Sequence, residues 1–98
     1  MKIANVIWLD PFAEKLAIKH HVTTQEAEEV LLTNPYIRRS RKGRVKGEDV
    51  YAAYGQTEAG RYLVVFFIHK GRGSALPISG RDMTTSERGL FDEQNKAH

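Results

Sequence analysis

The sequence has no cysteine among its 98 residues. This absence excludes disulfide bonds, thiolate zinc sites and a cysteine nucleophile. Long hydrophobic runs are missing too, since residues 63–68 form the longest one and a membrane-spanning helix needs about 20 residues. No signal-peptide pattern precedes Asp10. We therefore expect one cytoplasmic domain over residues 1–98, with no membrane association.

Motifs for nucleotide hydrolysis and metal binding are also lacking. Gly71 and Gly73 fall in a predicted turn, without the Gly-Lys-Ser/Thr run that opens a phosphate-binding helix. His20 and His21 are adjacent, so they cannot share one helix face as metal ligands. No serine has a nucleophile-elbow context. The sequence therefore predicts neither a metal site nor a cofactor.

The net charge of +3 is unevenly distributed along the chain. Residues 1–34 carry −2, residues 35–81 carry +7 from ten Lys/Arg and three acids, and residues 82–98 carry −2. A basic middle segment favours a polyanionic partner, first of all nucleic acid. The alternative is a solvated basic loop with no partner.

Hydrophobic periodicity predicts an α+β fold with two N-terminal helices, a central antiparallel sheet and a C-terminal helix. The first helix has Asp10 as its N-cap and Lys15 on its outward face, and capping boxes pair Thr23 with Glu26 and Thr84 with Glu87. We expect the helices on one face of the sheet, Pro77 at an edge or bulge, and a frayed tail over residues 95–98. The predicted elements are a strand over 3–9, helices over 11–20 and 23–33, strands over 36–41, 50–54, 61–69 and 75–78, and a helix from Thr84.

Arg, Lys, His, Tyr and Glu side chains on or beside such a sheet permit RNA cleavage without a metal. In that reaction a general base deprotonates a ribose 2′-OH, which attacks the adjacent phosphate while cations stabilise the developing charge. Two other classes remain open at this point. One is a basic module that binds nucleic acid without chemistry, and the other is an interaction protein that uses the acidic helical hairpin.

Three segments in order resemble one known family over residues 5–92. They are Ile7-Trp8-Leu9-Asp10 with Lys15 and Lys19-His20-His21-Val22, Tyr54-Gly55-Gln56-Thr57 with Gly60-Arg61-Tyr62-Leu63-Val64-Val65, and Ile78-Ser79-Gly80-Arg81-Asp82-Met83-Thr84 with Glu87-Arg88. Together they are similar to BrnT-type toxins of type II toxin–antitoxin systems, which are small ribonucleases with a RelE-like fold. His21 stands where that family usually has glycine, so a left-handed turn there would be held by histidine.

The resemblance implies a toxin that cleaves RNA, with mRNA as the expected target. It also implies a cognate antitoxin with a ribbon-helix-helix portion that neutralises the toxin. Operator DNA would be contacted only through the toxin–antitoxin complex.

Five residues are the predicted catalytic set. Arg81 would hold the scissile phosphate, or instead pair with Asp82 or Glu87. Arg61 matches the family, although an arginine at a strand end often simply extends to solvent. His20 is a candidate general acid or base, with Lys19 beside it to orient substrate; both also suit a helix C-terminus. Glu48 is the general base if its loop lies beside Arg81.

A second set is predicted to bind RNA. Its basic members would contact phosphates, and Tyr54 would stack on a base or pack within the sheet. The set is Arg38, Arg39, Arg41, Lys42, Arg44, Lys46 and Tyr54.

Overall fold

The computed structural model describes residues 1–41, 43 and 47–96. Its elements follow the predicted α+β order. No described helix is long and apolar enough to cross a membrane. The elements are β1 (Asn5–Val6), α1 (Asp10–His20), α2 (Thr24–Leu32), β2 (Tyr36–Arg41), β3 (Val50–Gln56), β4 (Tyr62–His69), β5 (Ser74–Asp82) and α3 (Thr85–Lys96).

Local sequence signals fix where the helices begin. Both predicted capping boxes are confirmed: Thr23 and Glu26 satisfy each other's backbone N–H groups, and so do Thr84 and Glu87. The predicted N-cap of α1 is wrong, because Leu9 occupies that position and Asp10 is the first helical residue. An acid in the first turn still faces the positive end of the helix dipole. The predicted fraying is wrong at residues 95 and 96, which belong to α3, whereas residues 97–98 lie outside the described residues.

The sheet has the strand order β1-β5-β4-β3-β2, with β4 in the centre as predicted. Strands β2 to β5 are antiparallel neighbours. The expectation of a wholly antiparallel sheet is wrong for β1, which pairs parallel to β5 through Asn5 with Ser74 and Val6 with Ala75. The strand predicted over 3–9 is also shorter, at Asn5–Val6. Hydrophobic spacing indicates a strand but not the direction of its partner.

Two irregularities interrupt the ladders. In β5, Phe66 lies opposite Ser79 and Phe67 opposite Pro77, so Ile78 is an extra residue. The bulge predicted near Pro77 is therefore confirmed, although β5 is not an edge strand. In β2 the register shifts between Arg39 and Arg41, which places Ser40 in a comparable position. Bulges of this kind redirect side chains.

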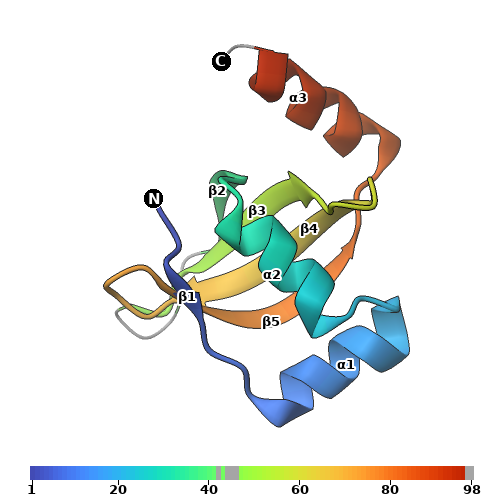
Figure 1. Ribbon diagram of the computed structural model, residues 1–98. Helices are drawn as coiled ribbons and strands as arrows, with labels where there is room; N and C mark the ends of the chain where they lie inside the picture. Colours follow the sequence, from blue (N-terminus) through green and yellow to red (C-terminus); the bar gives the residue numbers. More distant parts are fainter. Residues whose placement is uncertain (42, 44–46, 97–98) are drawn as a thin grey trace.

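One face of the sheet is covered by α1 and α2 (Figure 1), which pack mainly on β5 and β3. Leu16 and Val30 from these helices are fully buried, together with Leu63, Val65 and Phe67 of β4. We call this side the covered face. A Cβ added at Gly80 would lie 2.9 Å from Leu16 Cδ2, so the helix approaches β5 closely.

The opposite side, here called the open face, is much less covered. Ala52 and Val64 pack there with Met83 and Phe91, flanked by half-buried aromatic side chains. Among the described helices, α3 reaches this face, and so do Phe12 and Lys15 of α1. Helix α3 lies beyond the end of the sheet (Figure 1), and its Phe91 ring packs edge-on against Tyr62. The prediction that all helices pack on one face is therefore wrong, because Phe91 of α3 packs with Met83 on the open face.

Candidate functional site

Arg81 lies on the open face, held by the start of α3. Its Nη1 and Nη2 donate to Glu87 at 2.7 and 3.0 Å, and Nη1 also donates to the Asp82 carbonyl. The guanidinium lies 5.5 Å from the Phe66 ring centroid. Nε and the second Nη2 hydrogen have no partner among the described residues, and the side chain is 40% exposed. Glu87 thus fixes the orientation of the Arg81 guanidinium, and the Nε–Nη2 edge keeps donors that no described residue uses.

The Arg81–Glu87 pair is ionised across a wide pH range. The hydrogen bond from Arg81 lowers the pKa of Glu87 from 4.5 to about 2, helped by the Thr84 backbone N–H. The same bond raises the pKa of Arg81 above its ordinary value. A fixed carboxylate therefore holds a fixed cation at the open face.

Arg61 lies just before β4 and makes contacts with the covered side. Nε and Nη2 donate to the Asp82 carboxylate at 2.8 and 3.3 Å, and Nη1 donates to Glu26 at 3.2 Å. Arg61 also donates to the carbonyls of His20 and His21, at 3.2 and 2.6 Å. These contacts tie the C-terminus of α1 to the N-terminus of α2 and the end of β5.

Both carboxylates that Arg61 contacts, Asp82 and Glu26, have lowered pKa values. The hydrogen bond from Arg61 lowers the pKa of Asp82, whereas that of Glu26 is lowered first by the Thr23 backbone N–H and then by Arg61. The Asp82 bond in turn raises the pKa of Arg61. Arg61 and Arg81 therefore occupy the same end of the sheet but serve opposite faces.

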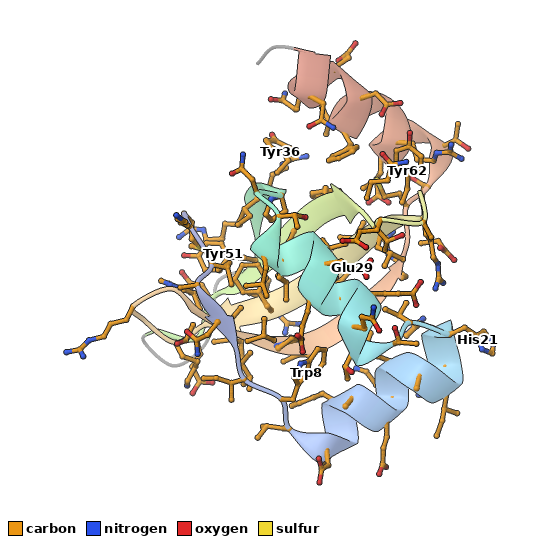
Figure 2. All side chains as sticks on the ribbon, viewed as in Figure 1. Trp8, His21, Glu29, Tyr36, Tyr51 and Tyr62 are labelled. Atoms are coloured by element: carbon orange, nitrogen blue, oxygen red, sulfur yellow. The ribbon has the colours of Figure 1, made fainter. Side chains whose placement is uncertain are left out.

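The other predicted catalytic residues are dispersed. His20 is half-buried at the last position of α1, and its carbonyl is held by Arg61; Lys19 is exposed. His21 has φ 53° and ψ 38°, which confirms the left-handed turn, and its side chain projects from the end of α1 (Figure 2). These residues lie at the Arg61 end of α1.

Glu48 is not brought beside Arg81. Strand β3 begins at Val50, and Arg81 lies level with Tyr54 through Val64. Four residues along a strand span roughly 13 Å. The structure thus places Glu48 near the opposite end of the sheet from Arg81, because the β2–β3 connection lies at that end.

The predicted RNA-binding residues are partly brought together. Arg38 and Arg41 share the register of the open face and are exposed on the edge strand β2, whereas Arg39 pairs with Asp49 at 3.4 Å. Tyr54 lies on the open face, with its ring centroid 6.0 Å from that of Tyr36. The predictions for Lys42, Arg44 and Lys46 fall outside the described residues.

Sequence reasoning missed a hollow of about 520 Å³ on the open face. Lys15, which helical periodicity predicts to face solvent, lines this hollow together with Phe12. The helical i, i+3 spacing of these two residues was the available signal. The described residues that line the hollow are Phe12, Lys15, Ser40, Arg41, Val50, Phe66, Ile68, Ile78 and Ser79.

No group of three or more His, Asp or Glu side chains that could hold a metal occurs within residues 1–41, 43 and 47–96. The described open face offers guanidinium, ammonium, hydroxyl and phenol groups, beside the Glu87 carboxylate that holds Arg81. Such groups bind phosphate and stabilise its developing negative charge.

Comparisons with known proteins identify the family. A search of curated proteins found no match. The fold is similar to the crystal structure of the Brucella abortus ribonuclease toxin BrnT, with a TM-score of 0.62 at 18% identity, covering 83% of this chain and 97% of that one. Residues 8–87 match the family model described as the ribonuclease toxin BrnT of type II toxin–antitoxin systems. The chain therefore belongs to the BrnT family of ribonuclease toxins.

Proposed function

We propose that this chain cleaves RNA without a metal ion, at the open face of its sheet. A ribose 2′-OH attacks the adjacent phosphorus, the P–O5′ bond breaks, and the 5′-oxygen leaves with a proton. The products are a 2′,3′-cyclic phosphate and a 5′-hydroxyl. The 2′-OH requirement makes RNA, and not DNA, the substrate.

The observation that supports this proposal is the orientation of the Arg81 guanidinium on the open face. Glu87 fixes one edge of the guanidinium, and the other edge offers N–H donors to the open face. A phosphate bound there would receive charge-assisted hydrogen bonds that strengthen as negative charge develops on its oxygens. Arg38 and Arg41 lie on the same face and would hold neighbouring phosphates.

Arg61 has a different role in this proposal. Its donors are engaged by two carboxylates and two carbonyls, so we assign it to positioning α1. His20 remains the candidate for proton transfer and Lys19 for orienting the substrate, whereas the position of Glu48 at the other end of the sheet does not support it as the base at Arg81.

The family also indicates a partner. We propose that a cognate antitoxin with a ribbon-helix-helix portion neutralises this chain, and that operator DNA is bound through the complex. Purification of the chain with the product of the adjacent reading frame tests this. A stable complex that restores growth is expected, and coexpression without rescue contradicts it.

The nuclease proposal is tested with a short RNA incubated in EDTA. We expect cleavage to a 2′,3′-cyclic phosphate, no cleavage when the scissile nucleotide is 2′-deoxy, and a strong reduction for Arg81→Lys, which retains charge but not the guanidinium edge. Binding without cleavage would instead support a module that only binds nucleic acid.

A further inference from the structure

The hollow on the open face is built by residues from α1, β2, β3, β4 and β5. Its volume of about 520 Å³ falls within the roughly 300–1,000 Å³ typical of small-ligand sites. Phe66, Ile68 and Ile78 give it an apolar floor, and Ser40 and Ser79 add hydroxyl groups. This composition suits a flat, largely apolar ligand with polar edges.

Both bulges of the sheet open into this hollow. Consecutive strand residues normally point to opposite faces. Yet Ile78 and Ser79 of β5 both line the hollow, and so do Ser40 and Arg41 of β2. Each pair lies at a register shift, so each bulge adds a wall residue that a regular strand would turn away.

The rim of the hollow is positively charged. Lys15 of α1 lines it from the β5 side and Arg41 from the edge strand β2, and none of the described residues that line it is acidic. Lys15 is half-buried, with Nζ 5.8 Å from the Phe12 ring centroid, so its stem packs along the wall. The rim therefore favours a ligand that carries negative charge on both sides of its apolar part.

Phe66 connects the hollow with Arg81. Its ring lines the floor and also lies 5.5 Å from the Arg81 guanidinium. A ligand seated on the Phe66 ring thus lies near the Arg81 guanidinium. A nucleotide within an RNA strand has the required form, because its planar base is attached to a ribose that lies between two phosphates.

Resting on the proposed function, we propose that this hollow binds one unpaired nucleobase of single-stranded RNA, while Lys15 and Arg41 hold the flanking phosphates. A base in a duplex is stacked and paired inside an A-form helix and cannot enter a hollow in a sheet. The substrate class is therefore single-stranded RNA with one base turned out of its stack.

An abasic scan tests this inference. A short fluorescent 2′-O-methyl oligoribonucleotide, which cannot be cleaved, is bound to the full chain with the base removed at one position at a time. We expect one position to cost about fivefold or more in affinity, from the lost contacts of its base. The fully paired duplex should bind more weakly than the single strand at the same salt concentration.

Variants show whether that base occupies the hollow. Ile78→Asn and, as a milder change, Ile68→Thr should remove the penalty of the abasic position, because both alter the floor. Ile18→Asn is the matched control, since Ile18 is 75% exposed and does not line the hollow. Lys15→Gln should weaken every oligonucleotide and reduce the salt dependence, whereas Lys2→Gln should do so less.

The outcomes separate this inference from the proposed function. An abasic penalty that is absent from the scan, or that persists unchanged in folded Ile78→Asn and Ile68→Thr, overturns the base-binding hollow even if RNA is cleaved. An abasic penalty that both variants remove, without any cleavage of ordinary RNA, supports the hollow and overturns the nuclease. Circular dichroism establishes that each variant is folded.

Discussion

Arg61 and Arg81 are two arginines at one end of the same sheet, with different surroundings. Arg61 bonds to side chains and carbonyls from both N-terminal helices and β5 on the covered side. Arg81 is held along one edge by Glu87 and faces the open side with the other. The difference teaches that a shared family motif does not give two arginines the same role. We infer that Arg61 supports the fold and Arg81 the chemistry.

The largest expected effect is that of Arg81→Ala on catalysis. Loss of phosphate stabilisation should lower kcat/KM for RNA cleavage by about 100-fold. Arg72→Gln removes the same charge from an exposed turn and is the matched control. Steady-state kinetics with a fluorogenic RNA measures both. An Arg81→Ala enzyme as active as Arg72→Gln would end the distinction between the arginines.

Arg61→Ala should have the opposite profile. Removal of the guanidinium takes a donor away from Asp82, Glu26 and two carbonyls, and we expect a loss of about 2 kcal/mol in the free energy of unfolding. For a domain of this size that corresponds to a Tm lower by about 10 °C. Thermal and urea unfolding measure the loss. In the temperature range where the variant is folded, kcat should stay near the unchanged value, and a selective fall in kcat would place Arg61 in the chemistry.

Gly80→Ala tests how closely the covered face is packed. The new Cβ would lie 2.9 Å from Leu16 Cδ2 and 3.3 Å from the Val64 carbonyl oxygen. We expect destabilisation of about 1 kcal/mol from this crowding. Gly89→Ala in α3, where a Cβ meets no atom within 4 Å, is the control and should not destabilise. Equal unfolding midpoints for the two variants would show that α1 yields to the added methyl group.

The smallest expected effect is on the pH dependence of stability, through the Arg81–Glu87 pair. Because the pKa of Glu87 falls from 4.5 to about 2 on folding, the ionised side chain stabilises the folded state fully above pH 4.5. That contribution is lost progressively as the pH falls toward 2. Glu87→Gln should flatten stability over this range, relative to Glu93→Gln on the exposed side of α3. Unfolding curves from pH 2 to 6 with equal slopes for Glu87→Gln and the unchanged chain would contradict the Arg81–Glu87 pair.

Features set by neighbours in sequence were predictable. The capping boxes at Thr23 and Thr84, the helices that follow them and the central strand β4 depend on local hydrogen bonds and hydrophobic periodicity. Glu87 was one of the two partners expected for Arg81, because the two residues lie only six positions apart. These interactions are short-range, so the sequence contains their pattern directly.

Features set by distant partners were not predictable. The Arg61 contacts join residues 21 to 41 positions apart. The parallel pairing of β1, and the bulges that turn Ile78 and Ser40 into the hollow, depend on how strands fit across the sheet. Lys15 was predicted to face solvent, because helical periodicity does not show that α1 wraps past β5. The site was therefore only partly visible before the fold was known.

The parallel pairing of β1 also has a consequence for synthesis on the ribosome. Asn5 and Val6 pair with Ser74 and Ala75, so β1 cannot join the sheet until β5 has been synthesised. Until then α1, which begins at Asp10, is not anchored, and Phe12 and Lys15 cannot form their side of the hollow. A nascent chain would thus lack a complete binding surface until β5 has left the ribosome.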